Sequence, residues 1–139
     1  MKSPALLLVA CAALVSAAAH AETQKFHAVM NGATEVPAKT TDGKGTVDAT
    51  FDTTTKVLTY DVTFSGLTGP ATMGHMHGPA DPGANAAVMV PFAMPVTSPL
   101  HGTATLTDAQ VTALESGKMY ANVHTAANPG GEIRGQMMK

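Results

Sequence analysis

The sequence predicts an all-β protein, an antiparallel β-sandwich or barrel-like domain that carries one short helix. Three observations support this fold class. Long stretches with helical periodicity are missing, apolar and polar residues alternate in short runs, and Gly, Pro, Asn and Asp separate those runs. About seven or eight short strands with one helix are typical of a sandwich or a closed barrel.

The first half of the chain predicts three strands, at residues 25–30, 45–51 and 56–64. The last two form the clearest hairpin, because apolar residues alternate in both and Asp52-Thr53-Thr54-Thr55 provides a turn between them. In the returning strand the alternating apolar residues are Leu58, Tyr60, Val62 and Phe64. This period of two indicates a strand with one buried face.

The second half predicts further strands at residues 72–77, 87–92 and 102–106, separated by loops rich in proline and glycine. The single helix is expected over residues 107–116, because Thr107 can cap its start and Gly117 can end it. Residues 119–124 and 132–137 then form a last hairpin across Asn128-Pro129-Gly130-Gly131.

The N-terminus predicts export. Lys2 is followed by an apolar run over residues 5–19 and by Ala19-His20-Ala21, an A-x-A cleavage motif. We therefore expect residues 1–21 to be a signal peptide, residues 22–139 to be one domain, and the protein to be periplasmic or secreted. Cys11 follows Leu8-Val9-Ala10 in a lipobox-like order, so lipoprotein anchoring at Cys11 is the alternative. No later stretch is apolar enough to predict a membrane span.

The composition after residue 21 excludes several function classes. Seven basic residues face ten acidic ones, a net charge of −3 that argues against nucleic acid and anionic membranes as partners. Cys11 is the only cysteine, so disulfides, thiol catalysis and cysteine-based metal sites are excluded from the predicted domain. Eight methionines remain, which either fill gaps in the core or act as soft ligands for Cu(I).

His75-Met76-His77 is the strongest chemical signal in the sequence. Residues two apart on a strand face the same side, about 6.5–7 Å apart, so two imidazoles there can reach one ion. Met73 belongs to the same face, and His124 from the last hairpin can supply a third nitrogen. The predicted metal ligands are therefore Met73, His75, His77 and His124, with copper preferred and zinc second.

Other residues are weaker candidates. His27 is expected at the surface, and His101 is a ligand only if its strand neighbours the site. Glu132 can orient His124 as a nearby carboxylate, or it can form an ion pair on its strand with Arg134. The histidines themselves can also do no more than hydrogen-bond the loops that follow their strands.

Four sequence blocks resemble the CHRD (chordin-type) domain family, and they span nearly the whole chain from about Phe26 to Met137. The blocks are Gly32-Ala33-x-Glu35-Val36-Pro37, His75-x-His77-Gly78-Pro79-Ala80, Tyr120-x-Asn122-Val123-His124-Thr125 and Pro129-Gly130-Gly131-Glu132-Ile133-Arg134-Gly135-Gln136. The resemblance implies an extracellular β-sandwich-like domain. Animal members occur in chordin, which antagonises secreted growth factors, and bacterial members are small exported proteins. The cysteine-rich modules of chordin are missing from this chain, so growth-factor antagonism is not carried over.

Two function classes follow. The first is an exported protein that binds a transition-metal ion, preferably copper, through the histidine cluster. The second is an extracellular module that binds a protein or glycan partner, or serves as a structural part, with no metal. We assign no catalytic residues, because the sequence contains none of the familiar hydrolase, phosphate-loop or metalloprotease motifs. A third class, a metal-dependent oxidoreductase, would also need an open coordination position and a substrate pocket, and a sequence shows neither.

Overall fold

The computed structural model describes residues 22–139. In chain order its elements are β1 (Thr23–Asn31), the 3-10 helix η1 (Gly32–Thr34), β2 (Lys44–Asp52), β3 (Val57–Ser65), β4 (Ala71–His77), β5 (Val88–Pro91), β6 (Leu100–Thr105), α1 (Asp108–Glu115), β7 (Tyr120–Thr125) and β8 (Ile133–Gln136). The predicted signal peptide and Cys11 lie outside the described residues.

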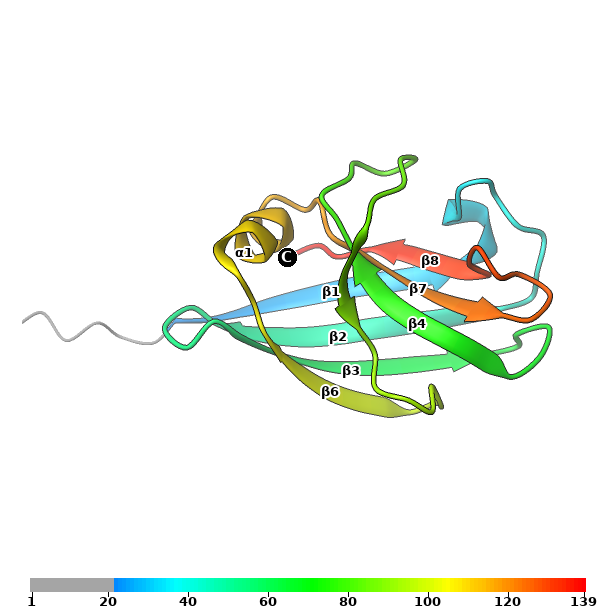
Figure 1. Ribbon diagram of the computed structural model, residues 1–139, viewed down its shortest axis with the longest axis horizontal. Helices are drawn as coiled ribbons and strands as arrows, with labels where there is room; N and C mark the ends of the chain where they lie inside the picture. The colour runs from blue at the N-terminus through cyan, green and yellow to red at the C-terminus, as the bar shows by residue number, and fades with distance from the viewer. Residues whose placement is uncertain (1–21) are drawn as a thin grey trace, which may run out of the picture.

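The eight strands form a single antiparallel sheet that curls into a nearly closed barrel (Figure 1). Their order across the sheet is β5-β4-β7-β8-β1-β2-β3-β6. The predicted fold class is therefore confirmed, and so are the hairpins β2–β3 and β7–β8. The helix also matches its prediction, since Thr107 and Gln110 form a capping box at its start and Gly117 follows its end with a φ of +69°.

Alternating burial explains how the strands build the core. In β1, β2 and β3 every second residue is buried, which gives each strand one apolar face toward the inside of the barrel. Those inner residues are Phe26, Ala28, Met30, Val47, Ala49, Phe51, Leu58, Tyr60 and Val62. Four methionines fill the same core without any exposed surface, namely Met30, Met76, Met119 and Met137. These four thioethers therefore act as packing groups.

Phe92, directly after β5, helps to close the curled sheet. Its amide donates a 2.9 Å hydrogen bond to the Gly74 carbonyl in β4, and its ring packs 5.4 Å from the ring of Tyr60 in β3. A Cβ at Gly74 would lie only 2.5 Å from that ring, so the strand needs glycine there. Phe92 thus joins one edge of the sheet to a strand near the other edge.

β7 departs from the alternating pattern, because all six of its residues are buried. Ala121 and Val123 face the core, whereas Tyr120, Asn122 and His124 point to the outer side of the barrel. Two loops cover that outer face. Ala86 in the β4–β5 loop hydrogen-bonds Tyr120, and Pro129 in the β7–β8 loop hydrogen-bonds His124. A polar face of the sheet is therefore enclosed without belonging to the hydrophobic core.

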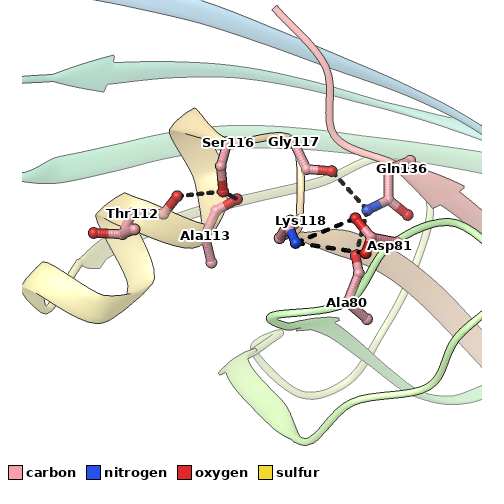
Figure 2. Close-up of polar contacts among 8 residues, drawn as sticks. All are labelled: Ala80, Asp81, Thr112, Ala113, Ser116, Gly117, Lys118 and Gln136. Atoms are coloured by element: carbon pink, nitrogen blue, oxygen red, sulfur yellow. Dashed lines mark hydrogen bonds and ion pairs between the residues drawn. The ribbon is translucent and has the colours of Figure 1, made fainter.

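The β4–β5 loop is anchored to the turn between α1 and β7 (Figure 2). The Ala80 amide donates to the Lys118 carbonyl at 2.9 Å, and Lys118 Nζ lies 3.4 Å from a carboxylate oxygen of Asp81. Gln136 Nε2 donates to the carbonyls of both Ala80 and Gly117, at 2.9 and 2.8 Å. These contacts hold the loop over β7. Across residues 22–139, no helix is long and apolar enough to cross a membrane.

Candidate metal centre

The histidines of β4 and β7 come together through strand pairing. β4 and β7 are antiparallel neighbours, and their register places Met73 opposite His124, His75 opposite Asn122, and His77 opposite Tyr120. Because side chains alternate between the two faces of a strand, all of these residues share the outer face. The predicted convergence of a third histidine on the H-x-H pair follows from this register.

One ring nitrogen of each of His75, His77 and His124 lies within 4.8 Å of the other two. The shortest approach is 3.2 Å, between His75 Nδ1 and His124 Nε2. The His75 ring lies edge-on to the other two, with centroid distances of 5.4 Å to His77 and 5.0 Å to His124. The structure therefore contains a three-histidine cluster that could hold a metal ion.

Backbone carbonyls set the tautomers of two of these rings. His77 Nδ1 lies 2.9 Å from the Ala86 carbonyl oxygen, and His124 Nδ1 lies 2.9 Å from the Pro129 carbonyl oxygen. A carbonyl oxygen only accepts, so each Nδ1 carries a hydrogen and donates it. In the neutral rings Nε2 then keeps its lone pair, which is the form that coordinates a metal.

The surroundings also favour neutral imidazoles. Burial lowers the pKa of His75, and the neighbouring His124 and His77 rings lower it further. Burial lowers the pKa of His124 as well, which outweighs the opposite effect of its hydrogen bond with the Pro129 carbonyl. Rings that resist protonation keep lone pairs free for a cation.

Asn122 lies between the histidines on the same face. Its Oδ1 is 3.1 Å from His77 Nε2 and 3.0 Å from His124 Nε2. Its Nδ2 faces the other way, toward the buried carboxyl group of Glu35. A Cβ added at Gly131 would overlap Glu35 Oε1 and come within 2.9 Å of Asn122 Nδ2, so the two side chains border the same small space. Gly131, with a φ of +122°, leaves the space in which these two groups meet.

A stack of three flat groups supports His77 from the side. The Tyr120 ring is parallel to the His77 imidazole at a centroid distance of 4.9 Å, and the Arg134 guanidinium lies 3.5 Å from the Tyr120 ring centre. Arg134 is itself held by Asn85 Oδ1 and by the Ala84 carbonyl, at 3.0 and 2.7 Å. Aromatic stacking and a cation–π contact therefore hold the ring of His77 in position.

The other predicted ligands lie as follows. Met73 is on the same outer face, opposite His124 in register, and its side chain is largely exposed. His27 and His101 are on the opposite part of the sheet, at the surface, where they pair with Asp48 and Asp61. His101 is therefore not a ligand of this cluster, and the expected surface position of His27 is confirmed.

The predicted roles of Glu132 are wrong. Its carboxylate hydrogen-bonds neither His124 nor Arg134 and lies instead among threonine hydroxyls. Fully buried there, it accepts hydrogen bonds from the Thr41, Thr68 and Thr125 hydroxyls at 2.6–2.7 Å and from the Thr68 amide at 2.8 Å. Burial alone would raise its pKa, but these donors lower the pKa to about 2. Glu132 ties three loops together beside the cluster.

Comparison with protein families identifies the domain. A family model described as CHRD domain matches residues 26–137, nearly the whole of the described chain. The chain belongs to the CHRD-domain family. No curated protein and no solved structure gives a significant match.

In this CHRD domain, the four sequence blocks that carry the resemblance meet around the histidine cluster. The first supplies Glu35, the second His75 and His77, the third Asn122 and His124, and the fourth the Gly131 turn with its flanking residues. Residues that are up to about a hundred positions apart in sequence thus build one enclosed polar site.

Sequence reasoning missed three parts of the CHRD site. Tyr120 and Asn122 precede His124 by four and two positions on one strand, so the same period of two that grouped His75 with His77 would have placed them beside it. The contact of Glu35 with this face depends on a loop after β1, and no local pattern in the sequence indicates it.

Proposed function

We propose that this protein is an exported CHRD-domain protein that binds one transition-metal ion through His75, His77 and His124, with copper as the preferred metal. The observation that carries the proposal is the convergence of three imidazoles, two of which have their lone pairs directed inward by backbone carbonyls. This is the arrangement of donor and outer hydrogen bond that metal-binding histidines need.

The donor chemistry supports copper. Imidazole nitrogens suit copper and zinc, and among divalent first-row ions copper binds most strongly to a given site of this kind. Met73 at the exposed margin of the cluster remains the predicted sulfur ligand, which would favour Cu(I) over zinc.

The test is calorimetric titration of the metal-free protein with Cu(II), Cu(I) and Zn(II). We expect one copper ion per chain and weaker binding of zinc. In the double variant His75→Ala/His77→Ala, copper affinity should fall by more than about 100-fold, because two of three nitrogens are removed.

The matched control is His27→Ala/His101→Ala, which removes two histidines from the surface pairs on the other part of the sheet. Its copper affinity should equal that of the unmodified protein. Equal losses in both double variants, or binding no tighter than micromolar in the unmodified protein, would contradict the metal proposal.

The alternative function is a protein- or glycan-binding or structural module in which the same histidines only secure loops. The hydrogen bonds of His77 to Ala86 and of His124 to Pro129 favour it, since they tie both covering loops to the sheet. If this were the whole role, His75→Ala/His77→Ala would lose stability equally with and without metal. Metal-dependent stabilisation of the unmodified protein alone supports the metal site.

Export is supported by the sequence of residues 1–21, with its basic start, apolar run and Ala19-His20-Ala21 motif. Mass spectrometry of the protein produced in a bacterial host should find Glu22 at the mature N-terminus. A lipid-modified Cys11 at the N-terminus would show instead that the chain is a lipoprotein.

A further inference from the structure

We infer that Asn122 is a fourth ligand of the metal, through its Oδ1 atom, and that Glu35 holds the amide in the orientation this requires. This inference rests on the proposed metal site and deepens it. It assigns three nitrogens and one neutral oxygen to the bound ion.

The distances around Asn122 Oδ1 fit a shared ion. Metal–ligand bonds of about 2.0–2.1 Å place neighbouring ligand atoms about 2.8–3.4 Å apart for angles between 90° and 109°. Asn122 Oδ1 lies 3.0 and 3.1 Å from the two Nε2 atoms of His124 and His77, and His75 Nδ1 lies 3.2 Å from His124 Nε2. Each of these three separations fits a pair of neighbouring ligands on one ion.

The chemistry of the same atoms favours a cation between them. The Nε2 atoms of neutral His77 and His124 are acceptors, because their Nδ1 hydrogens are donated to carbonyls. An amide oxygen is also only an acceptor. Three lone-pair atoms therefore face one another, and Asn122 is only 3 % exposed. A buried acceptor without a donor is unfavourable, and a metal ion satisfies all three at once.

Glu35 explains why the amide points this way. Its carboxyl group is buried, and its Oε1 borders the space beside Gly131 that Asn122 Nδ2 also borders. The amide nitrogen of Asn122 is the donor that lies beside that oxygen. With Nδ2 directed at Glu35, Oδ1 must point to the imidazoles. Glu35 is thus a positioning residue that acts through Asn122.

A neutral oxygen among three imidazoles narrows the choice of metal. Carbonyl oxygen is a hard donor that suits divalent ions, whereas Cu(I) prefers soft donors. With Asn122 bound, the site is matched to Cu(II) and Zn(II), and the exposed thioether of Met73 is not needed to complete four ligands. Divalent copper is therefore the expected cargo in the presence of oxygen.

The first test compares Asn122→Leu, which keeps the size of the side chain and removes the oxygen, with the unmodified protein in Cu(II) titration and electron paramagnetic resonance. Affinity should fall about 10- to 100-fold, and the copper spectrum should change because an oxygen ligand is lost. Glu35→Gln should weaken binding less and shift the spectrum in the same direction. Exposed Glu115→Gln is the control and should leave both unchanged.

The second test exchanges the amide of Asn122 and the carboxylate of Glu35. In the double variant Asn122→Asp/Glu35→Gln the net charge is kept. The carboxylate now at position 122 can offer one oxygen to the metal, and the amide now at position 35 can donate to its other oxygen. Copper affinity in this double variant should be at least that of the unmodified protein. Loss of copper binding in the folded double variant would overturn the inference, because it would mean that the amide of Asn122 presents its N–H groups to the imidazoles.

The outcomes separate the two proposals. If the unmodified protein binds no copper or zinc, the metal function itself fails. If it binds copper and Asn122→Leu binds equally well with the same spectrum, only the fourth ligand is wrong. Thermal unfolding of each variant in chelator shows that the domain is folded when its affinity is measured.

Discussion

Glu132 shows how much one residue can contribute to this domain. Its carboxylate has no exposed surface and accepts hydrogen bonds from Thr41, Thr68 and Thr125, which lie in separate parts of the chain. Hydrogen bonds to a charged group are stronger than neutral ones, and a buried charge that loses them is costly. The strength of this set explains why the pKa of Glu132 is held at about 2.

Glu132→Gln should lower the free energy of unfolding at pH 7 by about 2–4 kcal/mol, because the amide offers only one acceptor oxygen and brings unmatched N–H groups. Urea denaturation measures this loss. Glu115→Gln, a change of the same kind at an exposed position, should cost less than about 0.5 kcal/mol. Equal stability of the two variants would contradict the role given to Glu132.

The same residue makes a prediction about pH. The pKa of Glu132 is lower in the folded protein than the ordinary value of 4.5, so its stabilising effect is complete above about pH 4.5. As the pH falls toward 2, the folded carboxylate becomes protonated and the effect is lost. The difference in unfolding free energy between the unmodified protein and Glu132→Gln should therefore shrink over this range. A difference that stays constant from about pH 6 to about pH 2.5 would be inconsistent with the lowered pKa.

At the scale of elements, α1 is stabilised by its N-terminal capping box. Thr107 accepts a hydrogen bond from the Gln110 amide, and the Gln110 side chain accepts one from the Thr107 amide. Gln110 also donates to the Met89 carbonyl in β5 at 2.7 Å, which links the helix to an edge strand of the sheet. Loss of the cap therefore affects both the helix and its attachment.

Thr107→Ala should lower the free energy of unfolding by about 1 kcal/mol, as expected when an N-cap hydroxyl is removed. Thr112→Ala is the control, since Thr112 is exposed in the middle of α1 and alanine is a better helix former there. It should be neutral or slightly stabilising in the same chemical denaturation experiment. The changes in the free energy of unfolding of the two threonine variants should therefore differ in sign, or clearly in size.

The elements themselves could be predicted well from the sequence, and their limits less well. Alternation identified β2 and β3, and capping signals identified α1, because both depend on residues close together in the chain. β1 is longer than predicted, Thr23–Asn31 instead of 25–30, because it pairs with β2 along its whole length. Pairing is a property of two strands, so the end of one strand cannot be derived from its own residues alone.

The residues of the candidate site fall into the same two groups, those that local spacing predicts and those that depend on strand pairing. His75 and His77 could be grouped from spacing within one strand, whereas the place of His124 depended on β7 lying beside β4. Glu132 could not be placed, because its carboxylate is bound by Thr41, Thr68 and Thr125, and no local pattern in the sequence brings these residues together. The sequence did not indicate a role for the amide of Asn122, since asparagine does not titrate and rarely marks a metal site.

At the scale of the whole molecule, closure of the curled sheet depends on contacts between its two ends. Phe92 packs against Tyr60 and against Gly74, which belong to strands on different sides of the barrel. The order of the strands in the sheet could not be predicted from the sequence, because it is decided by such long-range packing.

Phe92→Ala should lower the free energy of unfolding by about 3–5 kcal/mol, since Phe92 is only 5 % exposed and its removal leaves a cavity between the ends of the sheet. Phe92→Leu, which fills most of the space, should cost clearly less. Thermal unfolding followed by circular dichroism measures both. A cost below about 1 kcal/mol for Phe92→Ala would show that closure does not depend on this ring.

The histidine cluster lies on the outer wall of the barrel, under two loops, with His75 and His77 partly accessible and His124 buried. In the proposed metal-binding function, an ion would therefore meet the H-x-H pair first and reach His124 without disturbance of the apolar interior. Loading and release of the ion in this proposed role would then take place at the surface and leave the core packed.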